Sequence, residues 1–358
     1  MFYREAGQYK VTYEADQAIF PIAQDRFVMR ALLVIAFVIV PFVATEYAYR
    51  AVLIPVVILG LAAIGLNVLM GYCGQVSLGS GAFMGVGAYA AYNLSIHLPF
   101  LNPLVCILLS GFVAAGIGIL FGIPSLRIKG FYLACATLAA QFFGDWAFLR
   151  IKWITNYTPS GSVNAPSIEL FGLDLNSPTA IYIVALAFTV VLGLATKNLV
   201  RGHIGRQWMA IRDMDIAAEI IGVRPMYAKL TAFAVSSFLI GVAGAMWAFL
   251  YLGSWEPAAF SIDRSFQLMF MVIIGGLGSI LGSVLGAAFI VLLPIFLNQA
   301  LPPLGALVGW RISTATVSHF EAMIFGALIV FFLVVEPHGL ARLWSIAKEK
   351  LRLWPFPH

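Results

Sequence analysis

Long apolar runs dominate the chain, and short polar segments separate them. A helix needs about 20 apolar residues to cross the hydrocarbon core of a bilayer, because each residue adds only about 1.5 Å. Eight runs reach that length or come close to it, and they lie near residues 31–49, 51–71, 81–97, 103–123, 130–150, 179–197, 230–251 and 320–336. This pattern predicts a bundle of membrane-spanning helices.

A ninth apolar run, from about 262 to 298, is too long for one upright span. Gly275, Gly276, Gly278 and Ser279 interrupt its middle. Glycine at this density is typical of a tight turn. We therefore expect two shorter spans in this run, and about ten transmembrane helices in an all-α fold.

The composition excludes the soluble classes of protein. The chain has 358 residues, of which 61% are hydrophobic and 10% are charged, with a mean hydropathy of +0.95. An ordinary soluble domain is about 45–50% apolar and about 25% charged. A soluble enzyme, a disordered chain and a disulfide-built secreted module are therefore ruled out. The three cysteines lie in apolar stretches without metal-like spacing, so we expect no metal site.

The basic residues predict the orientation. With ten spans, 16 of the 21 Lys and Arg residues fall on the inside, which then holds both termini, whereas nine spans would put the C-terminal tail outside and leave 13 inside. The positive-inside rule thus favours ten spans with both termini in the cytoplasm. The +5 net charge is a signal of membrane topology and not of nucleic-acid binding. We expect a cytoplasmic segment 1–30 without a signal peptide, a transmembrane domain 31–336 and a cytoplasmic tail 337–358.

A glycine-rich segment between residues 65 and 87 carries the first candidate functional residues. It places Asn67, Gln75, Ser77 and Ser80 at membrane depth among glycines that include Gly71, Gly74 and Gly79. One interpretation is a broken helix beside a permeation path, because irregular backbone in a membrane must be covered by protein or line a wet cavity. The other is close helix packing through small residues. The cluster around Gly275, Gly276 and Gly278 echoes this segment and hints at an internal repeat.

Two polar loops stand out in this layout, an outside loop at 153–178 and an inside loop at 198–229. The run from Arg206 to Ile221 favours an amphipathic helix, and Gly222 suits its C-terminal end. The residues available for its apolar side are Trp208, Met209, Ile211, Ile216 and Ile220. Such a helix can lie on the lipid surface or dock into the groove of a soluble partner.

The sequence shows no motif for catalysis of its own. It contains no G-x-x-x-x-G-K-[ST] phosphate loop, no metal-spaced cluster of His, Cys and carboxylates, and no nucleophile motif. Asp145 is the best-placed carboxylate within a span, but it lies near the end of that span, where a carboxylate is usually interfacial. The energy for any transport is therefore expected to come from another protein.

Five motifs in this order resemble the permease subunits of branched-chain amino acid ABC importers, of the LivM type. They are Gly65-Leu66-Asn67 with Gly71–Gly79, then Arg127–Ala134, the loop Gly205–Gly222, Val272–Ser279 and the tail Glu336–Leu340. The resemblance covers residues 55 to 345. It implies a bacterial inner-membrane subunit that forms the amino acid path together with a second permease. A periplasmic binding protein would deliver the solute, and two cytoplasmic ATPases would bind the ATP, so that this chain needs no cofactor.

The resemblance also assigns the inside loop. ABC permeases carry Glu-Ala-Ala-x-x-x-Gly in a short helix that docks into the ATPase, and Ala217, Ala218 and Gly222 match this pattern. Ile216 stands at the Glu position, with Asp215 and Glu219 beside it. The resemblance thus places the ATPase contact at Arg212, Asp215, Ala217, Ala218, Glu219 and Gly222.

The chain departs from the family in three places. Ser80 stands where the family usually has His, Thr158–Ser162 stands where it often has Thr-Gly-Gly, and the N-terminal segment is longer. Relatives carry other amino acids, urea, short amides and aromatic acids, so the solute stays open. The alternative from another class is a stand-alone secondary carrier or channel for a small polar solute such as urea or an amide.

Overall fold

The computed structural model describes residues 12, 23–123, 131–158, 160–166, 169–170, 173–174, 177–307, 314–335 and 339–353. Most of the expected cytoplasmic segment 1–30 lies outside the described residues, and so do Arg127–Gly130 and Glu336–His338 of the family motifs.

The described chain is almost entirely helical. Its first half forms α2 (Ala23–Val34), the π-helix η1 (Ile35–Ile39), α3 (Val40–Val43), α4 (Glu46–Ala48), the π-helix η2 (Tyr49–Leu53), α5 (Ile54–Asn67), the π-helix η3 (Val68–Tyr72), α6 (Ser80–His97), α7 (Pro103–Gly122) and α8 (Phe131–Arg150). Its second half begins with short strands β1 (Val163–Asn164), β2 (Glu169–Leu170) and β3 (Leu173–Asp174). Then follow α9 (Pro178–Arg201), α10 (His203–Ile220), α11 (Pro225–Met246), the π-helix η5 (Trp247–Leu252), β4 (Ser254–Trp255), the 3-10 helix η6 (Pro257–Phe260), α12 (Ile262–Gly275), α13 (Ile280–Leu307), α14 (Thr314–Val335) and α15 (Gly339–Leu353).

These helices confirm a polytopic helical membrane protein. Within the described residues, six helical stretches are long and apolar enough to cross a membrane: Glu46–Tyr72, Pro103–Gly122, Pro178–Arg201, Pro225–Leu252, Pro257–Gly275 and Ile280–Leu301. Shorter apolar helices lie at Phe27–Val43 and Met323–Phe332, and α6 and α8 occupy the other two predicted spans. Each of the ten predicted segments therefore contains a helix.

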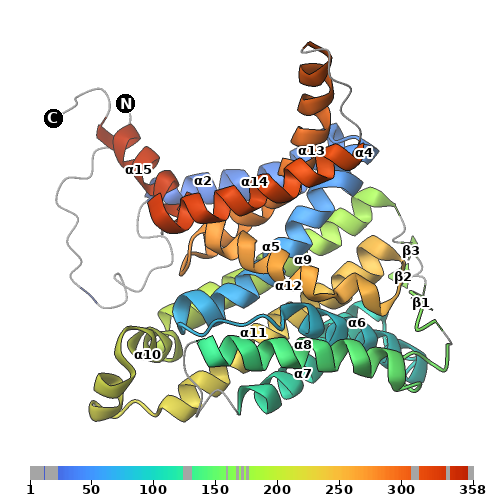
Figure 1. Cartoon of the computed structure of the whole chain (residues 1–358), viewed down its shortest axis with the longest axis horizontal. Coiled ribbons are helices and arrows are strands. Elements are labelled where there is room, and N and C mark those ends of the chain that lie inside the picture. Colours follow the sequence, from blue (N-terminus) through green and yellow to red (C-terminus); the bar gives the residue numbers. More distant parts are fainter. Residues whose placement is uncertain are drawn as a thin grey trace.

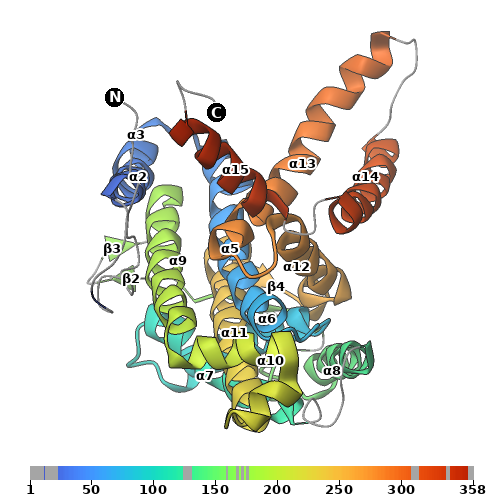
Figure 2. The same ribbon diagram turned by 90° about the vertical axis from the view of Figure 1, so that its left-hand side faces the viewer.

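The ends of the bundle differ. In Figure 1, α10 and α15 lie at the left end, while β1, β2 and β3 lie at the right end. Figure 2 turns the left end toward the viewer, with α15 above and α10 below. Because α10 and α15 lie at the same end of the bundle, the chain crosses the membrane an even number of times between them. The assignment of the α10 end to the cytoplasm stays a prediction.

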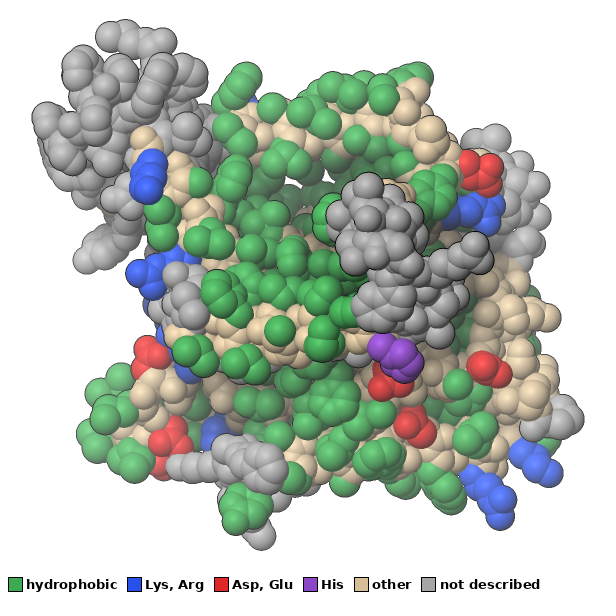
Figure 3. Space-filling model, turned by 45° about the horizontal axis from the view of Figure 1, so that its top comes forward, with side chains coloured by type: hydrophobic (Ala, Val, Ile, Leu, Met, Phe, Trp, Pro, Cys, Tyr) green, Lys and Arg blue, Asp and Glu red, His purple; other side chains and the backbone are tan. Residues whose placement is uncertain are grey.

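The surface seen in Figure 3 is mostly hydrophobic, and the Lys and Arg side chains lie near its left and right margins. Basic residues near the two ends of a largely apolar surface are typical of a protein whose middle faces lipid.

The centre of the bundle is formed by α5 and α11. The stretches Glu46–Tyr72 and Pro225–Leu252 are 78% and 83% buried, against 22% for Pro178–Arg201. Glycines allow close contact with α11: a Cβ atom at Gly65 of α5 would lie 2.9 Å from the Leu239 Cβ atom, and one at Gly87 of α6 would overlap the Gly241 carbonyl. Close helix packing therefore explains these glycines of the first cluster.

The second glycine cluster forms the predicted turn. The chain leaves α12 at Gly275 and enters α13 at Ile280. Gly276 and Gly278 have φ angles of +116° and +76°, in the region that favours glycine. A Cβ atom at Gly275 would overlap the Gly282 carbonyl, so glycine also lets α12 and α13 approach closely. The long apolar run is thus two helices, as the sequence predicted.

The boundary between the first two predicted spans differs from the sequence expectation. The chain turns at Ala44–Thr45 and not near residue 50. The Thr45 hydroxyl oxygen accepts a hydrogen bond from the Ala48 amide at 3.3 Å, which caps the new helix. Glu46 and Arg50 then form an i,i+4 ion pair at 3.1 Å within this helix. Arg50, which stands between the predicted segments 31–49 and 51–71, is therefore inside the helix.

The predicted outside loop is a polar connection with little regular structure. Its β1 pairs antiparallel with β4, with Val163 opposite Trp255 and Asn164 opposite Ser254, and β2 pairs with β3. The first pair fixes the loop to the segment that precedes α12.

Candidate functional site

The central helix is broken after η3. Residues Cys73–Gly79 are not helical, and α6 begins at Ser80. Gln75 and Ser77 on this stretch and Ser80 at the start of α6 are 5%, 1% and 0% exposed, so protein covers these three side chains, while Gly74 and Val76 are exposed. The structure thus shows an irregular segment between η3 and α6, and the interpretation of this segment as part of a permeation path stays a prediction.

Two polar atoms of this stretch stand out. The Gln75 Oε1 and Ser80 Oγ atoms are buried and have no hydrogen-bond partner within the described part of the chain. A buried polar group without a partner costs free energy, so such atoms in a native protein are often explained by an ion, water or ligand. By contrast, the Ser77 Oγ atom accepts a hydrogen bond from the Gly79 amide at 3.4 Å.

Side chains from α8 and α12 hold the start of α6. The Leu78 amide donates to Thr137 Oγ1 at 2.9 Å, the Gly81 amide to Ser265 Oγ at 2.7 Å, and the Ala82 amide to Gln141 Oε1 at 2.6 Å. The first amides of a helix have no partner within that helix. Here uncharged oxygens from two other helices supply those partners in the interior of the protein.

Gln141 is the centre of this cap. Its Oε1 atom also accepts from the Ser265 hydroxyl at 2.9 Å, and its Nε2 group donates to the Phe260 carbonyl at 2.9 Å and to Asp145 Oδ1 at 3.0 Å. Sequence reasoning missed Gln141 and Ser265. The available signal was a carboxamide within the largely apolar run of α8, because polar side chains are rare at membrane depth.

Asn67 connects the two glycine clusters. Its Nδ2 group donates to the Ser279 carbonyl at 2.9 Å, to Ser283 Oγ at 2.7 Å and to the Gly276 carbonyl at 3.3 Å. Its Oδ1 atom accepts from the Gly278 amide at 2.8 Å. Asn67, predicted on the path, therefore holds the α12–α13 turn in this structure.

Arg212 extends this contact to α10. Its Nη1 atom donates to the Gly71 carbonyl at 2.9 Å, and its Nη2 atom pairs with Asp213 Oδ1 at 2.9 Å. A Cβ atom at Gly74, where φ is +71°, would lie 2.9 Å from the Arg212 Cγ atom. The structure thus brings Arg212, Gly71, Gly74 and Asn67 together at one end of the bundle. Gly79 lies farther along the broken stretch, where its Cβ atom would lie 2.9 Å from the Thr137 carbonyl oxygen.

The first part of α10 packs against the bundle. Trp208 is fully buried, and its Nε1 group donates to Thr231 Oγ1 of α11 at 3.0 Å. Ile211 is also buried, and a Cβ atom at Gly205 would overlap the Val200 carbonyl. This part of the loop is therefore fixed to the spans on both sides of it.

The second part of α10 projects from the bundle. Met214 has non-helical angles (φ −159°, ψ 97°) and divides the helix. Beyond it Ala218 is buried, while Ile216 and Ile220 are 69% and 82% exposed. The prediction of one continuous apolar face from Trp208 to Ile220 is therefore wrong, because the break at Met214 turns Ile216 and Ile220 outward.

Gly222 ends the projecting helix. It has a φ of +92°, its amide donates to the Glu219 carbonyl at 3.0 Å, and the Val223 amide donates to the Ala218 carbonyl at 2.9 Å. This is a Schellman end, which favours glycine because the left-handed conformation strains other residues. Ala217, Glu219 and Gly222 are exposed, and Asp215 is half-buried.

A bundle of membrane-length helices with a broken, polar central helix defines the class of polytopic transport proteins. The family model for the branched-chain amino acid transport system / permease component matches residues 48–335, and the chain belongs to this family.

Curated relatives of the chain include permeases of the same kind. The LivM permease of a high-affinity branched-chain amino acid transport system from Salmonella typhimurium is 30% identical over 89% of this chain and 75% of its own length. The LivM permease of Escherichia coli is 29% identical over 79% of this chain and 67% of its length. A ribose import permease, RbsC of Haemophilus influenzae, is 25% identical over 71% of this chain and 73% of its length. No solved structure matches the chain with significance.

Proposed function

We propose that this chain is the permease subunit of an ATP-driven importer of branched-chain amino acids in a bacterial inner membrane. It forms the amino acid path with a second, homologous permease. A periplasmic binding protein delivers the amino acid, and two cytoplasmic ATPases supply the energy. The chain itself carries no ATPase site and needs no cofactor of its own. Family membership and the LivM relatives support this proposal.

We propose that an ATPase docks on the second half of α10, which projects from the bundle. Ile216 and Ile220 expose large apolar side chains on a short helix that ends at Gly222, while Glu219 adds an exposed acid beside them. Exposed apolar side chains on a rigid helix suit the hydrophobic groove of a partner protein. The break at Met214 directs this helix away from the bundle.

The contact of Arg212 provides a route from the docked helix to the broken helix. Arg212 lies two residues before the break in α10, and its guanidinium donates to the carbonyl of Gly71, two residues before Cys73. When the ATPases close on ATP, a displacement of α10 would pull on this carbonyl. We propose that this is how ATP binding changes access to Gln75, Ser77 and Ser80.

The experiment that tests the assembly is gentle purification of the tagged chain, followed by identification of the co-purifying proteins and an ATPase assay. We expect a second permease and two ATPases, with ATP hydrolysis that rises when leucine-loaded binding protein is added. A chain that is recovered alone and moves solute across vesicles without ATP would instead be a secondary carrier or channel, and the proposal would fail.

Substitution at Gly222 tests the docking surface with a matched control. Gly222 is exposed and no atom lies within 4 Å of a Cβ atom there, so Gly222→Ala meets no steric conflict in the monomer, and Gly222→Trp carries the same backbone strain with a much larger side chain. We expect Gly222→Trp to abolish ATP-driven uptake and ATPase recovery, while Gly222→Ala retains most of both. Equal activity of the two variants would show that no partner packs on this helix end.

A further inference from the structure

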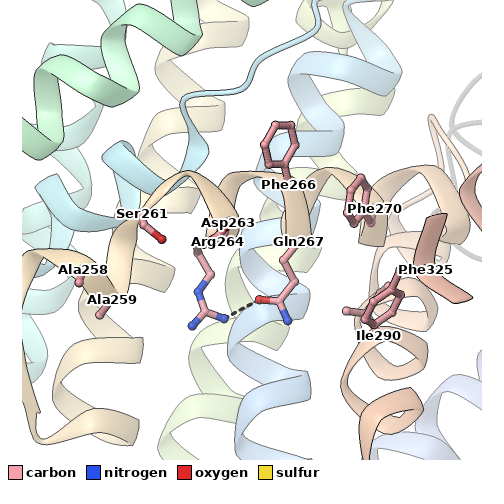
Figure 4. A pocket seen from close by; sticks show the side chains of 10 residues that line it. All are labelled: Ala258, Ala259, Ser261, Asp263, Arg264, Phe266, Gln267, Phe270, Ile290 and Phe325. Atoms are coloured by element: carbon pink, nitrogen blue, oxygen red, sulfur yellow. Dashed lines mark hydrogen bonds between the residues drawn. The ribbon is translucent and has the colours of Figure 1, made fainter. Parts of the chain in front are cut away.

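A cavity of about 630 Å³ lies beside the first turns of α12. Figure 4 shows Arg264 and Gln267 side by side on α12, with Ile290 of α13 and Phe325 of α14 close to each other at its far side. The cavity is therefore built from η6, α12, α13 and α14, of which α12 and α13 are joined by the glycine turn. Its volume falls within the range of sites for small organic ligands.

Arg264 is the basic residue of this cavity. It lies within the apolar stretch Pro257–Gly275, where a charged side chain is costly and usually functional. Its Nη1 atom donates to Gln267 Oε1 at 2.6 Å, and its guanidinium carbon lies 4.6 Å from the centre of the Trp247 ring. Among the described residues, no carboxylate oxygen lies within 4.0 Å of it. Its guanidinium thus keeps donors for an anionic group.

The other walls have complementary chemistry. Phe270, Ile290 and Phe325 present apolar surface, and Asp263 places one exposed carboxylate beside Arg264. A guanidinium binds a carboxylate through paired N–H donors, and a carboxylate binds an ammonium group. One cation, one anion and an apolar wall together match an amino acid with an apolar side chain.

We propose that this cavity is a transient binding site for such an amino acid, with Arg264 on its carboxylate, Asp263 on its ammonium group and the apolar wall on its side chain. The proposal rests on the proposed function and adds a location and residues to it. Arg264 would be a binding residue that touches the solute, and Gln267 and Trp247 would position its guanidinium.

The cavity lies at a position in the fold where an amino acid could enter the protein. Arg264 lies near the start of α12, about 18 Å along the helix from Gly276 in the turn that Asn67 holds, taking 1.5 Å for each of 12 residues. Ser265, directly after Arg264, accepts the Gly81 amide at the start of α6. A solute at Arg264 is thus one residue away from the side chains that hold the broken helix.

The test uses the complete complex in proteoliposomes, with leucine-loaded binding protein outside and ATP inside. Charged hydrogen bonds are worth about 1.5–3 kcal/mol, which corresponds to roughly tenfold or more, so Arg264→Gln should lower leucine uptake at least about tenfold. Arg50→Gln is the matched control, because Arg50 is an exposed arginine outside the cavity and should leave uptake unchanged. Arg264→Lys keeps the charge without the planar guanidinium, so its leucine uptake should lie between that of Arg264→Gln and that of Arg50→Gln.

Ala258→Trp keeps the proposal testable if Arg264→Gln fails to assemble. Ala258 lines the cavity and is exposed, so a Trp there narrows the site without removing a charge or a core contact. We expect it to lower leucine uptake as well. Normal uptake by either assembled variant, beside an active wild-type complex, would overturn the cavity proposal and leave the importer proposal standing. A wild-type complex without ATP-driven leucine uptake would refute the importer, and the cavity proposal with it.

Discussion

Gly71 offers the sharpest test of the contact between the two glycine clusters. A Cβ atom at Gly71 would overlap Asn67 Oδ1 and the Gly278 amide nitrogen, and it would lie 3.0 Å from the Gly278 Cα atom. Gly71 lies in η3 and is not among the residues with positive φ in the described chain. Gly71→Ala should therefore lower the free energy of unfolding through steric overlap alone, and this overlap displaces the Asn67 side chain and the α12–α13 turn.

The loss of stability in Gly71→Ala follows from the hydrogen bond between Asn67 and Gly278 that must break. The Asn67 Oδ1 atom accepts the Gly278 amide at 2.8 Å, and the Asn67 side chain is fully buried. Each buried polar group that loses its partner costs about 1–3 kcal/mol. Two such groups give a destabilisation of about 2–6 kcal/mol, and for a chain of this size we expect the Tm to fall by about 3–8 °C.

The assay is thermal unfolding of the detergent-purified chain, followed by size-exclusion chromatography after heating. Gly116→Ala is the control, because no atom lies within 4 Å of a Cβ atom there and the residue lies inside α7. Alanine in a helix interior is favoured over glycine by about 0.5–1 kcal/mol, so this variant should be equal to the wild type or slightly more stable. If both variants melt together, the close contact between Gly71 and the turn does not exist.

Three further substitutions separate stability from transport. Gln141→Leu leaves the Ala82 amide without its cap and should lower the Tm, at a cost of about 1–3 kcal/mol; an unchanged Tm would contradict the cap. Gln75→Leu removes a buried oxygen that has no described partner, so it should reduce leucine uptake without lowering the Tm, and unchanged uptake would remove Gln75 from the path. Ile220→Asp alters a side chain that is 82% exposed, so it should weaken ATPase co-purification while the Tm stays constant; full ATPase recovery would argue against docking.

The sequence predicted the helices well because their signal is local. Length and hydropathy determine whether a segment can cross a bilayer, and both are properties of a single run of residues. The split of the run 262–298 was also predictable, because Gly276 and Gly278 mark a turn by their own backbone preference. The turn at Ala44–Thr45 was missed because a threonine cap is a weak signal beside a charged residue at position 50.

The contacts of the site depend on residues far apart in the chain, which a single sequence does not reveal. Asn67 pairs with a turn more than 200 positions away, and Gln141 pairs with Ser265 at a separation of 124 positions. The outward direction of Ile216 depends on the backbone at Met214, and methionine carries no signal for a break. Arg212 was expected at an ATPase, but its contact with Gly71 depends on tertiary packing.

The chain from Arg212 through Gly71 and Asn67 to the α12–α13 turn joins three segments by side chain and backbone hydrogen bonds. Because Asn67 is surrounded by the atoms of this turn, a change at one partner alters the energy of the others, and their substitution effects cannot add. A double-mutant cycle between Asn67 and Ser283 should therefore give a substantial interaction energy, whereas a cycle between Asn67 and Gly116 should give none. The two halves of this chain are thus constrained to evolve as one unit at this point, even though each half forms its own helices.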